Sequence, residues 1–145
     1  MRVYLMRHAS AEDPGGVPDA LRRLTEQGSR EAREAGEALR ERGATVSVIL
    51  TSPRVRARET AELVAAAIGA PVQVRETLSC GATGEVFLAE LRSVESGGVL
   101  LVAHNPELSA FSSELLGQSI SFRPSTLVEV EMDGPTLEWL RHPNP

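Results

Sequence analysis

Short apolar runs alternate with longer amphipathic segments along this chain, and that alternation is the feature that most constrains its fold. Val46–Leu50 and Val99–Ala103 are apolar at almost every position, which is typical of strands buried on both faces of a sheet. The segment from Thr25 to Arg42 instead spaces its apolar residues three or four positions apart, which indicates an amphipathic helix. Strands that alternate with helices predict a largely parallel sheet with helices on both faces.

Turn and capping signals mark the ends of the individual elements. Thr25 and Ser52 are predicted helix N-caps, Asn105-Pro106 opens another helix, and Asp133-Gly134 marks the turn of a hairpin. The predicted strands are Arg2–Arg7, Val46–Leu50, Val72–Val74, Val99–Ala103, Leu127–Met132 and Thr136–Leu140. The predicted helices are 25–42, 53–68, 87–94 and 105–116. We therefore expect one domain over residues 1–145, a three-layer α/β/α sandwich whose mainly parallel sheet ends in an antiparallel edge.

Composition excludes several classes of partner. The chain has 145 residues, the size of one domain, and a net charge of −5, which argues against a nucleic-acid backbone as its partner. Its apolar runs are far shorter than the roughly 18–20 residues that span a bilayer, and no secretory leader follows Met1. Cys80 is the only cysteine, so no internal disulfide forms. We expect a cytoplasmic protein that binds neither membranes nor nucleic acid.

Polar residues that could take part in catalysis or binding follow three of the predicted strands. Parallel sheets place their sites at the carboxyl ends of the strands, so residues that follow different strands meet at one edge. Arg7 and His8 end the first strand, and His104 follows the fourth. The second strand leads into a segment with three alternate arginines, Arg54, Arg56 and Arg58. Two histidines and several arginines are therefore expected to converge.

This set of residues favours phosphoryl chemistry over a metal site. Metal sites combine histidine with cysteine or carboxylate ligands, whereas here the neighbours of the histidines are cationic, so we expect no metal and no organic cofactor. The planar guanidinium of arginine binds phosphate oxygens in pairs. Flanking cations also disfavour the protonated form of His8, which leaves a neutral, nucleophilic ring near pH 7.

Three motifs resemble those of one family. Leu5–Ala9, which contains Arg7-His8, closely resembles the Arg-His-Gly signature of the histidine phosphatase superfamily, which includes the phosphoglycerate mutases. Thr51–Ala61 resembles its second motif and Val102–Pro106 its third. Arg22–Gly28 is similar to a segment of the short bacterial phosphohistidine phosphatases. The likeness extends over nearly the whole chain and implies a phosphoglycerate mutase-like fold.

The resemblance assigns roles to particular residues. It implies that His8 is the nucleophile and that Arg7, Arg56 and His104 bind the phosphate. Arg22 is a further candidate for phosphate binding. Arg56 is preferred over its neighbours Arg54 and Arg58 on the resemblance alone.

The general acid has no assignment. Larger members of the family supply a carboxylate that protonates the departing oxygen, and phosphohistidine phosphatases often have one soon after a Cys-Gly pair. Here Ala82 and Thr83 follow that pair, and the nearest carboxylates are Glu76 and Glu85. Each is a candidate for the general acid, and each could also be an ordinary surface residue with no catalytic role.

We therefore expect a hydrolase that forms a phosphohistidine enzyme intermediate and acts on a phosphorylated protein, with phosphohistidine as the substrate. The chain has one long loop, residues 11–24, and so lacks the inserted segments that enclose small substrates in longer relatives. Two alternatives remain open from the residues: a phosphatase of small phosphomonoesters, and an inactive module that only binds phosphate.

Overall fold

The computed structural model describes residues 1–95 and 97–144, and within them the strands form a single six-stranded sheet. The strands are β1 (Arg2–Arg7), β2 (Val48–Thr51), β3 (Val72–Val74), β4 (Val99–Ala103), β5 (Leu127–Glu131) and β6 (Thr136–Arg141). Their order across the sheet is β3-β2-β4-β1-β5-β6. The first four are parallel to one another, whereas β5 and β6 pair antiparallel. This confirms the predicted parallel sheet with an antiparallel edge.

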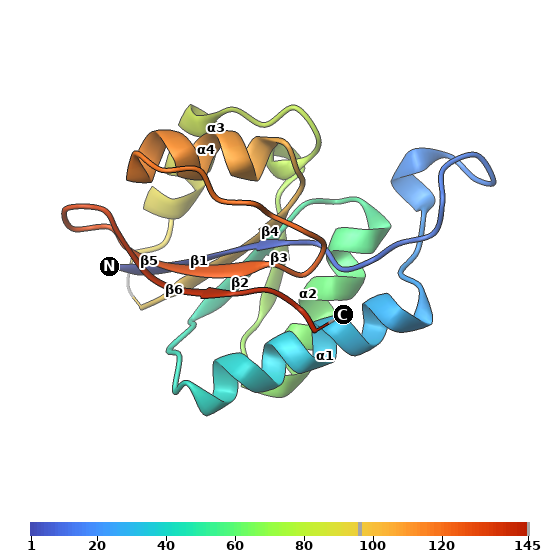
Figure 1. Ribbon diagram of the computed structural model, residues 1–145, viewed down its shortest axis with the longest axis horizontal. Coiled ribbons are helices and arrows are strands. Elements are labelled where there is room, and N and C mark those ends of the chain that lie inside the picture. The colour runs from blue at the N-terminus through green and yellow to red at the C-terminus, as the bar shows by residue number, and fades with distance from the viewer. Residues whose placement is uncertain (96, 145) are drawn as a thin grey trace.

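Helices cover both faces of the sheet, which confirms the predicted three layers. Helices α1 (Glu26–Glu41) and α2 (Val55–Ile68) lie on one face, and α3 (Gly84–Arg92) and α4 (Glu107–Leu116) lie on the other (Figure 1). Two short 3-10 turns, η1 (Asp19–Leu21) and η2 (Glu76–Leu78), complete the described elements. No described helix combines the length and apolarity needed to cross a bilayer.

Each face of the sheet has its own apolar core, because successive side chains of a strand point to opposite faces. Leu5 of β1 belongs to the cluster under α3 and α4, where it joins Phe87. Met6, the next residue, belongs to the cluster under α1 and α2 with Leu39 and Ala61. Burial on both faces explains why the central strands are continuous apolar runs in the sequence.

Helix α1 begins where the sequence predicted, but α2 does not. Thr25 is the N-cap of α1 and its side chain accepts a hydrogen bond from the amide of Gly28 at 3.0 Å. Ser52 was the wrong choice for α2, which begins at Val55 after Arg54 as N-cap. The Ser52 hydroxyl instead accepts from the amide of Arg54 at 3.2 Å and contacts a histidine, because its side chain is fully buried below the helix start.

The second strand lies slightly later than predicted, at Val48–Thr51 rather than Val46–Leu50. Its parallel pairing with β4 runs from Val48 to Thr51, so the ladder of hydrogen bonds sets its limits. Helix α4 likewise starts at Glu107, after the predicted Asn105. The Asn105 side chain still acts near this helix start, since it accepts from the amide of Ser109 at 3.0 Å.

Candidate active site

A cavity of about 290 Å³ lies at the carboxyl edge of the parallel strands. Chain segments that follow β1, β2 and β4 supply its walls, as the topology requires. Its lining residues are Arg7, His8, Ser10, Ala11, Arg22, Arg56, Cys80, His104, Asn105 and Pro124. The cavity therefore brings together the five residues predicted for the nucleophile and the phosphate. The two candidate acids, Glu76 and Glu85, are exposed and do not line it.

His8 sits directly after β1 and is held from two sides. Its amide donates to the carbonyl of Ala103 in β4 at 3.1 Å. Its ring Nδ1 lies 2.8 Å from the carbonyl oxygen of Ala9. Because a carbonyl can only accept, Nδ1 carries the proton and Nε2 keeps its lone pair. The tautomer that results is the one a nitrogen nucleophile needs.

The surroundings of His8 keep the ring neutral. Burial lowers the pKa of His8 from 6.5 to about 4, opposed by the hydrogen bond to Ala9 and reinforced by the charges of Arg56 and Arg7. The flanking cations expected from the sequence contribute to this shift, but burial is the larger cause, since the side chain is only 8% exposed. A neutral ring at pH 7 has its lone pair available for attack on phosphorus.

His104 follows β4 and faces His8, with the two ring centroids 5.3 Å apart. Its Nε2 lies 2.7 Å from the hydroxyl oxygen of Ser52. Burial, together with the neighbouring His8 and Arg56, lowers the pKa of His104 from 6.5 to about 3. The described side-chain atoms that are buried without a hydrogen-bond partner include two from residues that line the cavity, Nδ1 of His104 and Nε of Arg7. Buried unpaired polar atoms beside a cavity fit a ligand with acceptor oxygens.

The three arginines at the start of α2 differ in position. Arg56 is buried, with 4% of its surface exposed, and lines the cavity, whereas Arg58 is exposed. The Nε–H of Arg56 donates to Nε2 of His8 at 3.3 Å. Arg54 is half-buried beside the cavity and donates to Ser79 at 3.2 Å. Arg56 is thus the one of the three that contacts His8.

A threonine couples the loop of His8 to helix α2. The fully buried hydroxyl oxygen of Thr60 accepts from the amide of Ala9 at 3.0 Å and donates to the carbonyl of Arg56 at 2.7 Å. One side chain therefore joins Arg56, which contacts Nε2 of His8, to Ala9, whose carbonyl contacts Nδ1 of His8. Sequence reasoning missed Thr60, although it lies within the second motif, one helical turn after Arg56.

A buried glutamate anchors the next residue of the same loop. Glu31 of α1 accepts from the amide and the hydroxyl of Ser10 at 3.0 and 2.9 Å, and from the hydroxyl of Ser125 at 3.1 Å. Gly28 makes the approach possible, since a Cβ there would lie 1.9 Å from the carbonyl oxygen of Ser10. Glu31 lies next to the apolar stripe of its helix. An acidic residue at that position is the feature of the sequence that could have identified it as a buried, structural carboxylate.

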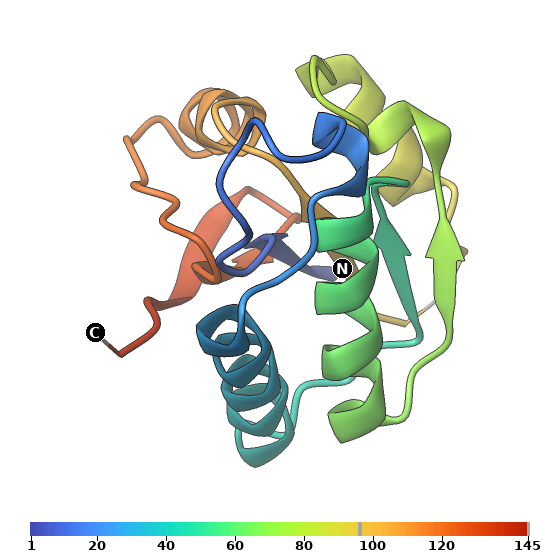
Figure 2. The same cartoon turned by 90° about the vertical axis from the view of Figure 1, so that its right-hand side faces the viewer.

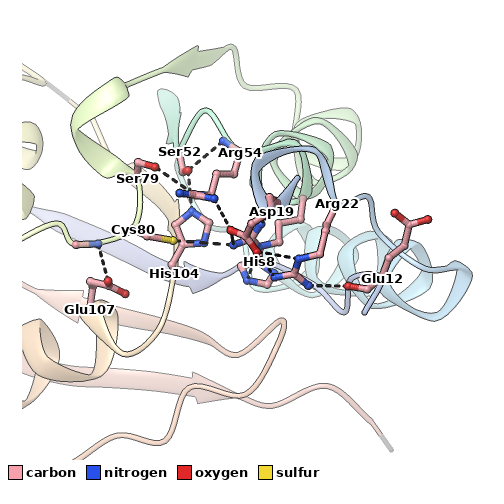
Figure 3. A network of polar contacts seen from close by, with 12 residues as sticks. His8, Glu12, Asp19, Arg22, Ser52, Arg54, Ser79, Cys80, His104 and Glu107 are labelled. Carbon is pink, nitrogen blue, oxygen red and sulfur yellow. Dashed lines mark hydrogen bonds and ion pairs between the residues drawn. The ribbon is translucent and has the colours of Figure 1, made fainter. Parts of the chain in front are cut away.

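An aspartate that the sequence did not single out bridges the arginines. Loop 11–24 folds back so that η1 lies beside the start of α2 (Figure 2). Oδ1 of Asp19 accepts from Nε of Arg22 at 2.9 Å, and Oδ2 contacts Arg54 (Figure 3). Oδ2 also accepts from Nη2 of Arg56 at 3.2 Å. No periodicity or spacing marks Asp19, because its position depends on how the loop packs.

The described residues contain no group of three or more His, Cys, Asp and Glu side chains placed to hold a metal ion. Cys80 lines the cavity with its thiol sulfur 3.9 Å from Nη2 of Arg56. The cavity is thus dominated by guanidinium and neutral imidazole groups, which together suit an anionic phosphoryl group.

Comparison with known proteins agrees with this chemistry. An uncharacterised protein from Mycobacterium leprae (strain TN) is 37% identical over 77% of this chain and 71% of its own length. Phosphohistidine phosphatase SixA from Escherichia coli (strain K12) is 29% identical over 99% of this chain and 94% of its own length. The solved structure of the protein histidine phosphatase SixA complexed with tungstate superposes with a TM-score of 0.86, at 27% identity over 97% of this chain and 96% of that one.

The likeness to this structure confirms the predicted phosphoglycerate mutase-like fold, and the likeness to both SixA proteins supports histidine phosphatase activity. A model of the histidine phosphatase superfamily, branch 1, matches residues 3–85, which include the first two of the three motifs. The chain therefore belongs to the histidine phosphatase superfamily.

Proposed function

We propose that this protein is a phosphohistidine phosphatase that hydrolyses the phosphoryl group of phosphorylated histidine side chains in proteins. The observation that carries the proposal is the state of His8: a neutral ring whose Nδ1–H is held by Ala9 and whose Nε2 lone pair faces the cavity arginine, Arg56. A module that only binds phosphate has no need of such a nucleophile.

The proposed reaction has two steps. An oxygen of the bound phosphoryl group first takes over the Nε–H of Arg56 that Nε2 of His8 accepts in the free protein. Nε2 then attacks phosphorus in line, the bond from phosphorus to the substrate nitrogen breaks, and its electron pair stays with the departing imidazole. Water then attacks the phosphorylated His8 and releases inorganic phosphate. Arg7, Arg56 and His104 stabilise the charge on the equatorial oxygens in both steps, with Arg22 at the rim.

The choice of substrate rests on the leaving group. An alkoxide needs a proton from an acid as it departs, and general acid catalysis contributes about 10²–10⁴ to such a rate. Among the described residues, no carboxyl group lines the cavity, and the carboxylate of Asp19, which lies beside it, is paired with three arginines rather than free to protonate a leaving group. The imidazole of phosphohistidine can be protonated on its other nitrogen before cleavage and then leaves as neutral histidine. The relatives named phosphohistidine phosphatase and protein histidine phosphatase support the same class.

The test is a comparison of kcat/KM for a phosphohistidine peptide, phosphoramidate, p-nitrophenyl phosphate and glycerol 3-phosphate at matched concentrations. We expect the phosphohistidine peptide and phosphoramidate to exceed glycerol 3-phosphate by at least about 10²-fold, the low end of what an acid contributes. The aryl phosphate should fall between them because its phenolate leaves more easily. A kcat/KM for glycerol 3-phosphate equal to that for the phosphohistidine peptide, together with loss of this activity in Glu76→Gln or Glu85→Gln, would place the enzyme among small-molecule phosphatases.

A further inference from the structure

We infer that Asp19 determines the specificity of the site: its ionised carboxylate faces the leaving group and selects a protonated imidazole over an ester oxygen. This inference rests on the proposed function and concerns the same site. The guanidinium of Arg56 spans the distance between His8 and Asp19.

The two ends of that guanidinium locate the attacking and departing groups. Its Nε–H donates to Nε2 of His8, while Nη1 and Nη2 at the other end donate to the carbonyl and the carboxylate of Asp19 at 2.8 and 3.2 Å. A phosphoryl group that binds along the guanidinium of Arg56 would therefore have His8 on one side, at the Nε end, and Asp19 on the opposite side, at the Nη end. In-line transfer places the leaving group opposite the nucleophile, and therefore on the side of Asp19.

The carboxylate of Asp19 is accessible to such a group. Half of its side-chain surface, 50%, is exposed, although Arg22, Arg54 and Arg56 contact it. A phosphoryl group that binds Arg22 and Arg56 competes for their N–H donors. That competition frees lone pairs on the carboxylate oxygens, which can then accept a hydrogen bond from the leaving group.

The carboxylate of Asp19 is placed to accept a hydrogen bond, not to donate a proton. Partial burial raises the pKa of its carboxyl, but the hydrogen bond from Arg22 and the charge of Arg56 outweigh this effect and hold that pKa below its usual value. An ionised carboxylate cannot protonate an alkoxide. It can accept from the free ring N–H of a phosphorylated imidazolium and so stabilise the cationic form that cleaves most easily.

The bonds balance without a further reactant. The imidazolium carries its N–H on the nitrogen that is not phosphorylated. When His8 forms the new N–P bond, the electron pair of the old P–N bond returns to the ring, and the ring leaves as neutral imidazole. Asp19 keeps its charge throughout, so no proton has to reach it from solvent.

The experiment compares Asp19→Asn with wild type on two substrates, a phosphohistidine peptide and p-nitrophenyl phosphate. Loss of a hydrogen bond between charged groups should lower kcat/KM for the peptide by roughly 10-fold to 10²-fold. The aryl phosphate gains nothing from the carboxylate, so its kcat/KM should stay constant or rise. The quantity measured is the ratio of the two values, which we expect to fall at least about tenfold.

Asp13→Asn is the matched control, since it removes the same charge from an exposed position of the same loop and should leave the ratio unchanged. A ratio that stays constant in Asp19→Asn overturns the inference. If both rates fall together, Asp19 only orders the arginines. If both rates rise together, Asp19 only competes with phosphate for them. An equal change in Asp13→Asn would also overturn it. If the wild type fails to cleave the phosphohistidine peptide at all, it is the proposed function that fails.

Discussion

The Nε–H of Arg56 donates to Nε2 of His8 over 3.3 Å, and the hydroxyl of Thr60 holds the carbonyl of the same arginine and the amide next to His8. The proposed nucleophile, His8, and the proposed charge stabiliser, Arg56, are therefore positioned as one unit rather than as two independent side chains. Such fixed positions matter because preorganised charge requires no rearrangement during the reaction.

His8→Ala should abolish turnover while leaving the fold intact, because no neighbouring group can replace the covalent carrier. The measurement is the trapping of phosphate on the protein in a form that is labile to acid and stable to base, present in wild type and absent from the variant. His142→Ala is a control for a histidine outside the cavity and should retain the label. Substantial turnover by His8→Ala would refute the mechanism.

Arg56→Ala and Arg7→Ala should each lower kcat by roughly 10²–10³, the usual effect of removing one preorganised charge stabiliser. Arg58→Ala removes the same charge from an exposed position of the same helix turn and should stay within a few-fold of wild type. Arg54→Ala, whose side chain contacts Asp19 and Ser79, should also remain within a few-fold. A larger loss in Arg54→Ala or Arg58→Ala than in Arg56→Ala would contradict the assignment.

Thr60→Val keeps the shape of the side chain but removes both hydrogen bonds that join Ala9 to Arg56. A buried amide left without a partner costs about 1–3 kcal/mol, so the free energy of unfolding should fall by that amount. We also expect kcat to fall more than KM rises, because the nucleophile loses its alignment. Thr60→Ser keeps the hydroxyl and should restore kcat; an equal loss in both variants would show that only packing matters.

The pH dependence of stability follows from the lowered pKa of His8. Its pKa is about 4 in the folded protein and 6.5 when unperturbed, so between these values the unfolded state binds the additional proton. The contribution of His8 to stability should therefore be complete above about pH 6.5 and decrease as the pH falls toward 4. Nuclear magnetic resonance titration should place the His8 midpoint well below 6.5. A midpoint at or above 6.5 would mean that the ring is charged near neutrality.

Exhaustive chelation should leave kcat/KM unchanged, because arginine and neutral histidine supply the charge stabilisation that a metal would otherwise provide. The measurement is turnover of a phosphohistidine peptide before and after dialysis against a chelator, with each divalent metal then added back. Activity that is lost on chelation and restored by one metal would reveal a metal requirement.

Much of the architecture could be predicted from the sequence because it depends on local patterns. Strands buried on both faces must be apolar at consecutive positions, so β4 at Val99–Ala103 was predicted with its observed bounds. Parallel strands share a carboxyl edge, so the proximity of His8 and His104 followed from the order of the elements. Thr25 was also identified correctly, since a helix cap is a local interaction.

The remaining features depend on contacts between residues far apart in the chain. Ser52 matched an N-cap locally, but burial against His104 gave its hydroxyl another partner, and the helix began at Val55, two residues later than predicted. Asp19 lies in a loop without periodicity, and it meets Arg54 and Arg56 only because that loop folds back onto α2. The sequence determined the strands, the helices and the edge that carries His8. Only the tertiary structure decided which distant carboxylate lies beside it, because side-chain contacts across a fold depend on packing rather than on spacing along the chain.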